Sequence, residues 1–408
     1  HKTQVMLIQN PLSPAQLQQL HDLPIHWVKT QDALFALLDD LEQVDTIALD
    51  TEFIKRDTFF PILALIQINT GKAIYLIDAP KLYLEEFWEV LADIPTVVLH
   101  ACGEDLGIYY LLSNLPALRN VFDTQIGLGF LTGENSLGYQ KSLQETIAVH
   151  VDKGESQSDW LQRPLTPEQE SYAVDDVRYL LPMFVAIKTQ LTEQGLWQYA
   201  VEDCQSYTQE IFANFSTPDN ALYLSVADYR DNREQLAMLQ TLCEWREQLA
   251  KSINRPRTFI LRPQALREII EKPPFSMKQL SFTSIKPNVI RMYGQEILTL
   301  IDKVRKEDDA SYPALLPLPY RSLSSDVQKQ LEKAIKQHGQ TLSIDETVLM
   351  RKKWLSELYA YAVAAEKPAL SPWLSGWRKA WIMAEILPIL DTVIANNPPS
   401  SEHETTAE

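Results

Sequence analysis

The sequence contains few cysteines, and those present form no recognisable pattern. Cys102, Cys204 and Cys243 are odd in number and lie far apart in a chain of 408 residues. They supply neither a disulfide framework nor the paired spacing of a zinc site. We therefore expect a protein of the reducing cytoplasm.

Long apolar runs are also missing. No stretch approaches the roughly 18–20 consecutive apolar residues that cross a bilayer, and no charged-then-apolar signal segment opens the chain. We expect no membrane association. The residues before Met6 are expected to be a tag remnant that takes no part in the fold. An apolar content of 45% can fill real cores, and the length predicts two to four domains.

Positive charge is scarce, since the formal net charge is −17. Such a balance argues against nucleic acid as a partner. The charges are unevenly distributed, however: residues 1–220 hold 12 Lys and Arg against 31 Asp and Glu, whereas residues 221–306 hold 15 against 9. One basic segment thus lies within an acidic protein, although ordinary surface variation would give the same count.

The first 200 residues alternate strand-like and helix-like stretches. Apolar periodicity predicts helices over 31–41 and 103–112 and strands over 46–53, 63–69, 73–77 and 96–100. This alternation is typical of an α/β fold with a mixed sheet. We expect this domain to occupy residues 1–215.

After residue 220 the strand-like runs stop and amphipathic helices follow one another. The first group, 221–306, has predicted helices at 228–253, 263–271, 286–291 and 294–306. Residues 307–320 contain acidic residues and then prolines, which is typical of a linker. The second group, 321–396, has predicted helices at 324–338, 344–364, 374–377 and 381–396. The tail at 397–408 is expected to be disordered.

Acidic side chains follow a buried strand at the first chemical signal. Asp50 and Glu52 end the run Ile47–Ala48–Leu49. Residues two apart on a strand face the same side, so the two carboxylates converge and repel each other. A hard divalent cation would relieve that repulsion. A strand end with solvated acids would show the same spacing.

Two further segments place acids at comparable positions. Asp105 falls in the first turn of a helix that follows the strand at 96–100, where open α/β sheets hold their sites; helix capping is the alternative. Tyr172 and Asp176 are four residues apart and share one helix face, while Asp175 lies on another. An ordinary amphipathic helix would also explain the latter pair.

Taken in order, the three segments resemble the three motifs of the DEDD exonuclease superfamily, in the subclass with a tyrosine in the third motif. They read LDTEF with Asp50 and Glu52, HACGEDL with Asp105, and YAVDD with Tyr172 and Asp176. Within that superfamily, residues 30–200 are most similar to bacterial ribonuclease D. Residues 232–306 resemble an HRDC module, and the segment around 372–378 resembles a second, degenerate one. Gly103 departs from the small polar residue expected there.

The resemblance implies a ribonuclease H-like exonuclease domain followed by two HRDC-type bundles. It implies a 3′–5′ exoribonuclease that releases nucleoside 5′-monophosphates and trims the 3′ ends of tRNA precursors and other small structured RNAs. Asp50, Glu52, Asp105 and Asp176 would hold two divalent cations, Mg²⁺ or Mn²⁺, because hard oxygen ligands suit these ions. Tyr172 would orient the attacking water. We expect a monomer.

Several residues are candidates for contact with RNA. Phe53 would stack on the terminal base, or else belong to the core. Gln67 would contact the RNA backbone, or else be a polar residue within the sheet. Arg255 and Arg257, in the basic segment, would hold the body of the RNA. His100, next to the second motif, is expected to be structural.

Three other functions remain open on the sequence alone. The first is a DNA exonuclease of the same superfamily. The second is a catalytically silent RNA-binding scaffold, against which the complete set of acids and Tyr172 argues. The third is a glycoside hydrolase with paired carboxylates, which needs no acids two residues apart on one strand.

Overall fold

The structure is a computed structural model, and it describes residues 9–152, 154–155 and 157–396. The expected tag remnant and the expected disordered tail lie outside the described residues. The chain forms two compact units. Of the described residues, the first contains those in 9–54, 63–215 and 320–396; the second contains residues 55–62 and 216–319. Within the part of the chain that is described, no helix has the length and apolarity needed to cross a membrane.

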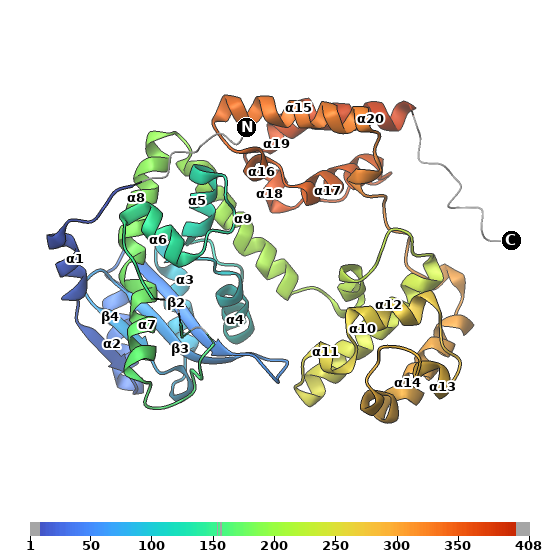
Figure 1. Ribbon diagram of the computed structural model, residues 1–408, viewed down its shortest axis with the longest axis horizontal. Coiled ribbons are helices and arrows are strands. Elements are labelled where there is room, and N and C mark those ends of the chain that lie inside the picture. The colour runs from blue at the N-terminus through green and yellow to red at the C-terminus, as the bar shows by residue number, and fades with distance from the viewer. Residues whose placement is uncertain (1–8, 153, 156, 397–408) are drawn as a thin grey trace. The chain divides into compact units, whose positions relative to one another are not determined.

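A six-stranded mixed sheet forms the centre of the first unit (Figure 1). Its strands, in spatial order, are β1 (Ile25–Val28), β4 (Ile74–Ile77), β3 (Ile62–Asn69), β2 (Thr46–Ile54), β5 (Thr96–Leu99) and β6 (Val121–Asp123). The pairs β1–β4, β2–β5 and β5–β6 are parallel, whereas β3–β4 is antiparallel. The prediction of a mixed α/β sheet is confirmed.

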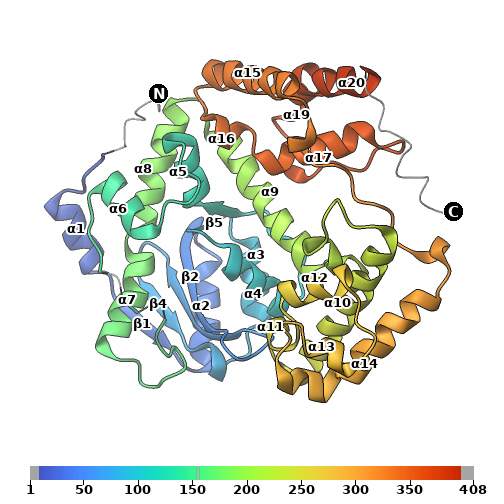
Figure 2. The ribbon, with the colours of Figure 1, turned by 45° about the vertical axis from the view of Figure 1, so that its right-hand side comes forward.

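Helices cover both faces of this sheet. They are α1 (Pro14–His21), α2 (Gln31–Leu41), α3 (Glu85–Asp93), α4 (Gly103–Ser113), α5 (Thr124–Thr132), α6 (Tyr139–Ile147), α7 (Pro167–Arg178), α8 (Leu180–Glu193) and α9 (Trp197–Phe215), with a short 3₁₀ helix at Ala79–Lys81. Figure 2 shows α2 and α7 alongside the strands. Successive residues of β2 contribute to opposite cores: Ile47 and Leu49 pack with α2, α3 and α4, while Ala48 packs with α7 and α8. Asp50 and Glu52 lie two and four residues after Ala48. Their side chains therefore point to the same face of the sheet as Ala48, toward α7.

The helices after residue 320 belong to the same unit as the sheet. They are η4 (Tyr320–Ser322), α15 (Ser325–Leu342), α16 (Glu346–Leu349), α17 (Lys352–Val363), α18 (Pro372–Ser375), α19 (Lys379–Trp381), the π-helical turn Ile382–Ile386 and α20 (Leu387–Asn396). Their buried side chains, among them Leu331, Trp354 and Trp373, are continuous with the core on one face of the sheet. Helix α18 packs against α9 (Figure 1).

The same compact unit thus includes residues 321–396, which the sequence predicts to be a domain of their own; that domain boundary stays a prediction. The physical reason for this inclusion lies on α9. Asp203 of α9 is 3% exposed and forms an ion pair with Arg378, which is 0% exposed. A buried carboxylate needs such a partner, so α9 is completed only by the helices that follow residue 320.

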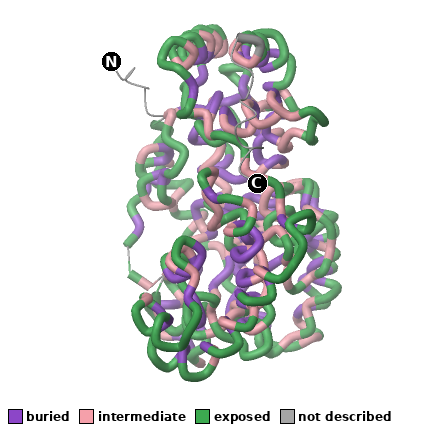
Figure 3. Tube along the Cα trace, turned by 90° about the vertical axis from the view of Figure 1, so that its right-hand side faces the viewer, coloured by how far each residue is buried: buried purple, intermediate pink, exposed green. Residues whose placement is uncertain are grey.

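The second unit is helical apart from one inserted loop. Its helices are η2 (Asp219–Ser225), α10 (Arg233–Ile253), α11 (Arg257–Ile260), α12 (Pro263–Glu271), α13 (Met277–Leu280), α14 (Pro287–Lys306) and η3 (Asp309–Ser311). Residues 307–319, expected to be a linker, pack on this unit: the Tyr312 hydroxyl donates to the Val304 carbonyl over 2.7 Å. Figure 3 shows buried, intermediate and exposed residues alternating along the chain.

Most predicted elements are present, with shifted bounds or breaks at a few of them. The predicted helix 228–253 begins only at Arg233, because Asn232 caps it and accepts from the Gln235 N–H. The two predicted helices 286–291 and 294–306 form one helix, α14. The helix continues through Gly294, where an added Cβ would lie 2.8 Å from the Met277 sulfur. The predicted helix 344–364 is interrupted at Met350 and Arg351.

Candidate active site

Three acidic side chains converge between β2 and α7. Asp50 and Glu52 of β2 and Asp176 of α7 each offer a carboxylate oxygen within 4.8 Å of the others. The sheet pleat explains the first two, and the packing of α7 on that face of β2 explains the third. The structure therefore brings together three of the four predicted metal ligands.

Asp105 lies next to this group without being part of it. It comes from the first turn of α4, and its carboxylate accepts a hydrogen bond from the Thr51 hydroxyl. Its negative charge also contributes to the raised pKa of Asp50. Glu104, the neighbour set aside from the sequence, is exposed.

The carboxylates destabilise one another when no cation lies between them. Burial is the largest cause that raises the pKa of Asp50, followed by the charges of Asp176 and Asp105. Burial and then the charge of Asp50 raise the pKa of Glu52 to about 9. Burial likewise raises the pKa of Asp176 well above its usual value and that of Asp105 to about 6.

This set of donors fits a divalent cation. All four groups are carboxylates, which are the hard oxygen ligands that Mg²⁺ and Mn²⁺ prefer. Bringing several acids into a desolvated site is costly unless a positive charge compensates them. The raised pKa values express that cost, and a bound cation would remove it.

The capping of α7 fixes where its functional side chains lie. Thr166 accepts from the Gln169 N–H, the Gln169 side chain accepts from the Thr166 N–H, and Pro167 occupies the first turn. From this start, Tyr172 and Asp176 fall on one face. The Tyr172 ring lies against buried Trp160, with ring centroids 5.8 Å apart. Asp175 points elsewhere and pairs with Arg178 over 3.8 Å.

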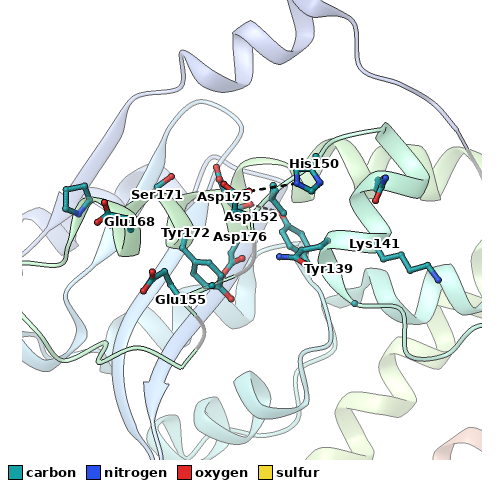
Figure 4. Close-up of a pocket in the computed structure, with 16 residues that line it drawn as sticks. Tyr139, Lys141, His150, Asp152, Glu155, Glu168, Ser171, Tyr172, Asp175 and Asp176 are labelled. Atoms are coloured by element: carbon teal, nitrogen blue, oxygen red, sulfur yellow. Dashed lines mark hydrogen bonds and ion pairs between the residues drawn. The ribbon is translucent and has the colours of Figure 1, made fainter.

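A cleft of about 1050 Å³ opens beside these residues. Tyr139, His150, Asp152, Tyr172 and Asp176 are among the residues that line it. Figure 4 shows Asp176 between the rings of Tyr172 and Tyr139. The cleft is large enough for a nucleotide, and the candidate metal ligand Asp176 lies in its wall.

Tyr139 is a residue that sequence reasoning missed. Its hydroxyl donates to the carbonyl of Asp175 over 2.7 Å, so α6 holds the turn of α7 that carries Asp176. No spacing in the sequence links residue 139 to residue 175, because the contact joins two helices 36 residues apart. Asp123 was missed for the same reason: it accepts from the N–H groups of Ala101 and Cys102 and fixes the turn before α4.

Gln67 is buried and hydrogen-bonded beside the candidate ligand Glu52. Its side chain is 0% exposed. The amide donates to Glu52 Oε1 over 3.3 Å and to the Ala173 carbonyl over 3.4 Å. These contacts favour the alternative of a polar residue within the sheet, and the contact of Gln67 with the RNA backbone stays a prediction.

Phe53 and His100, the other two candidates next to the motifs, contact side chains and backbone of the fold. Phe53 packs, partly buried, against the core formed with α2, α3 and α4. The His100 ring bonds the Thr124 hydroxyl over 2.7 Å and the Leu137 carbonyl over 2.8 Å, and burial lowers its pKa. These contacts agree with the expected structural role of His100.

Arg255 and Arg257 have partners within the second unit. The Arg255 guanidinium donates to the Asp57 carbonyl over 2.8 Å. Arg257 forms a two-pronged ion pair with Glu247 and lies over the Phe59 ring, 5.3 Å from its centroid. Both arginines therefore contact the loop 55–62, and their role in holding the body of the RNA stays a prediction.

Comparison with known proteins identifies the family. A model described as 3′–5′ exonuclease matches residues 25–192, and the HRDC domain model matches residues 235–301. Ribonuclease D of Pseudomonas paraeruginosa is 33% identical over 342 residues, which cover 82% of this chain and 89% of the relative. The chain belongs to the ribonuclease D family. Membership makes it a 3′–5′ exoribonuclease by enzyme class.

Other relatives agree with that assignment. Escherichia coli ribonuclease D is 31% identical over 345 residues, which cover 81% of this chain and 88% of the relative. The crystal structure of the Escherichia coli enzyme, described as an exoribonuclease involved in structured RNA processing, aligns with a TM-score of 0.82 at 27% identity, over 91% of this chain and 99% of that one. The catalytic core of Trypanosoma brucei RRP6, at 21% identity and a TM-score of 0.53 over 74% of this chain and 84% of that one, shares the fold. The HRDC model matches this ribonuclease D chain at residues 235–301, so the second module expected at 321–396 stays a prediction.

Proposed function

We propose that this protein removes nucleotides from the 3′ ends of structured RNAs, tRNA precursors among them, by hydrolysis assisted by two divalent cations. The observation that carries the proposal is the convergence of Asp50, Glu52 and Asp176 within 4.8 Å. Acids that raise one another's pKa at the wall of a cleft are typical of a metal-dependent hydrolase. The products would be nucleoside 5′-monophosphates.

Each ligand has a proposed role. Asp50 would contact both Mg²⁺ or Mn²⁺ ions, Glu52 and Asp176 would hold the one nearer the attacking water, and Asp105 would help to hold the other. When bound, such a pair of cations lowers the pKa of the attacking water and stabilises the departing 3′ oxygen. The protein's own contribution would be to hold four carboxylates close together, so that bound cations keep them ionised.

Tyr172 is the residue to which we assign the orientation of the attacking water. It lines the cleft together with Asp176, one helical turn away. A phenol with a pKa near 10 is a weak base at neutral pH. Its proposed role is therefore to accept or donate a hydrogen bond that orients the water. The Trp160 ring, which is 1% exposed, holds the phenol in place from behind.

Support for RNA over DNA comes from the family, since the matched relatives are ribonucleases. A glycoside hydrolase receives no support, because Asp50 and Glu52 lie in one cluster and do not flank a substrate site. We further propose three domains, with 1–215 as the exonuclease domain, 221–306 as the HRDC domain and 321–396 as an HRDC-like one. We also propose that the protein is a monomer and lies in the cytoplasm.

A time course on a 3′-extended tRNA with a 5′ label tests this function. We expect a ladder that shortens from the 3′ end with Mg²⁺, and none with EDTA or in Asp50→Asn. Glu104→Gln is the control, because Glu104 is exposed and lies outside the cluster. Binding without shortening in any metal would overturn hydrolysis and favour the scaffold. Equal cleavage of single-stranded DNA would favour the DNA exonuclease.

A further inference from the structure

Asp105 is the proposed ligand whose direction is least determined by its own element. Strand β2 and helix α7 carry the other three ligands, whereas Asp105 comes from the first turn of α4. An acid in a first turn commonly turns back on its own helix, because the backbone N–H groups there attract it. A ligand needs its carboxylate to point away from the helix, toward the cations. A residue outside α4 is therefore needed to set the direction of Asp105.

The backbone donor that would attract Asp105 already has another acceptor. In a capping box, the side chain at the third helical position accepts from the backbone N–H of the N-cap residue. In α4 the N-cap is Cys102 and the third position is Asp105. The Cys102 N–H donates to Asp123 Oδ2 over 3.0 Å, and the Ala101 N–H donates to Asp123 Oδ1 over 2.9 Å. Asp123 thus caps the helix, and Asp105 can bond elsewhere.

Thr51 is the residue that Asp105 bonds instead. It lies between the two acids of β2, and side chains alternate along a strand, so Thr51 points to the face opposite Asp50 and Glu52. On that face its hydroxyl donates to Asp105 Oδ1. An ionised carboxylate can only accept, which fixes the threonine as the donor. Because the hydroxyl engages Oδ1, Oδ2 is the oxygen that can face a cation.

The surroundings of this hydrogen bond favour it over an open arrangement. Thr51 is 7% exposed. Thr51 and Asp105 line a small cavity of about 20 Å³, together with apolar side chains that include Leu49, Leu99 and Leu106. A space of this size has room for about one water molecule. A hydroxyl or carboxylate left without a partner there is costly, so the bond between β2 and α4 is the stable arrangement.

We propose that Thr51 is a positioning residue that directs the Asp105 carboxylate toward the cations from the opposite face of β2. The inference rests on the proposed two-cation function and adds to it a residue that binds no metal itself. One strand then serves the site twice, with Asp50 and Glu52 as ligands on one face and Thr51 as the holder of a further ligand on the other. Valine at this position would fill similar space without supplying the donor.

Metal binding measured without RNA tests this role. The full chain would be titrated with Mn²⁺, and the free ion followed by electron paramagnetic resonance. We expect two ions per wild-type chain. In Thr51→Val the Kd of one ion should rise about 10–100-fold, as is typical when a residue that orients a ligand is lost, and that of the other ion should stay near its wild-type value.

A conservative variant and a rate measurement complete the test. Thr51→Ser returns the donor and should restore both Kd values. In Thr51→Val, hydrolysis of RNA should need a correspondingly higher Mg²⁺ concentration for half of its maximal rate, while KM for the RNA at saturating Mg²⁺ stays unchanged. A general loss of packing would not be repaired by the smaller serine side chain, so these readouts distinguish the hydrogen bond from the bulk of the residue.

Thr208→Val is the matched control, because Thr208 is 0% exposed and donates to the Leu118 and Gln205 carbonyls, over 2.7 and 2.8 Å, and not to an acid. Both of its Kd values should equal those of the wild type. Unchanged or uniformly raised Kd values in Thr51→Val, or an equal rise in Thr208→Val, would overturn the role of Thr51 alone. A wild type that binds fewer than two Mn²⁺ ions would overturn the two-cation function, and the role of Thr51 with it.

Discussion

At the scale of single residues, the site is a set of acids that oppose their own ionisation. Burial and the charge of Asp50 raise the pKa of Glu52 to about 9. A carboxyl raised above its unfolded value of about 4.3 destabilises the fold once it ionises. Its contribution to stability is therefore greatest below pH 4.3 and is lost as pH rises toward 9.

The first prediction follows from this dependence of stability on pH. Metal binding needs ionised ligands, so the rise in melting temperature on adding Mg²⁺ should grow between about pH 6 and pH 8.5. Differential scanning fluorimetry with and without EDTA measures it. In Asp50→Asn the metal-free protein should melt higher than the wild type, and the response to Mg²⁺ should disappear. A response that is the same at every pH would contradict the assignment of these acids.

A second prediction concerns the phenol of Tyr172. Tyr172→Phe retains the ring that lies against Trp160 and removes only the hydroxyl. We expect kcat to fall about a hundredfold, the range for a positioned proton-handling group, while KM and the melting temperature stay near wild-type values. Single-turnover kinetics on a short RNA measures the effect. An unchanged rate would mean that another residue orients the attacking water.

At the scale of elements, the sequence predicted parts of the site well and others not at all. Asp50 and Glu52 could be placed on one face because the period of a strand is two, and Tyr172 and Asp176 because a helical turn brings residues four apart together. Gln67 could not be placed, because its neighbours Glu52 and Ala173 are distant in the chain. Local periodicity does not encode which element packs on which.

The loop 55–62 shows the same limit. Nothing in its sequence predicts that the connection between β2 and β3 packs with the helices of the HRDC unit. Asn254, the C-cap of α10 in a left-handed conformation, uses its side-chain oxygen to accept from the N–H groups of Phe59 and Phe60, at 3.1 and 3.2 Å. The strand that carries Asp50 and Glu52 therefore continues into a loop held by another domain.

A third prediction tests whether the hydrogen bonds to Asn254 hold the loop 55–62 in place. Asn254→Gly keeps the left-handed backbone, which glycine adopts freely, and removes the acceptor. We expect trypsin to cut after Lys55 or Arg56 several-fold faster, because two backbone hydrogen bonds of the loop are lost. Asn114→Gly is the control, since Asn114 is the left-handed C-cap of α4. Equal cleavage rates in the two variants would mean that other contacts hold the loop.

At the scale of the whole molecule, one buried ion pair joins two segments of the first unit that are far apart in sequence. Asp203 of α9 accepts from Arg378 at 2.6 and 2.8 Å and from the Trp377 ring N–H at 3.0 Å. Arg378 also donates to the carbonyls of Val348 and Leu349, both at 2.8 Å. The guanidinium thus links α9 to the carbonyl end of α16, and these contacts of Arg378 are buried.

The last prediction is that this pair holds the C-terminal helices on the exonuclease fold. Arg378→Met leaves Asp203 buried and unpaired, which should lower the free energy of unfolding by about 3–5 kcal/mol. Hydrogen exchange should accelerate most in α15–α20. Lys353→Met is the control, because Lys353 joins the same α9 through Glu210 but is 55% exposed, and an exposed pair contributes about 0–1 kcal/mol.

The double variant Asp203→Leu/Arg378→Met separates packing from charge. Removing both partners leaves no buried charge, so part of the lost stability should return. If the double variant is as unstable as Arg378→Met, the arginine acts through its stacking on Trp354 and Trp377, at 4.7 and 4.0 Å, more than through Asp203. In either case the exchange rates in α7 and β2 should change least, because the ligands of the proposed metal site depend on Gln67 and Tyr139 for their positions and not on the C-terminal helices.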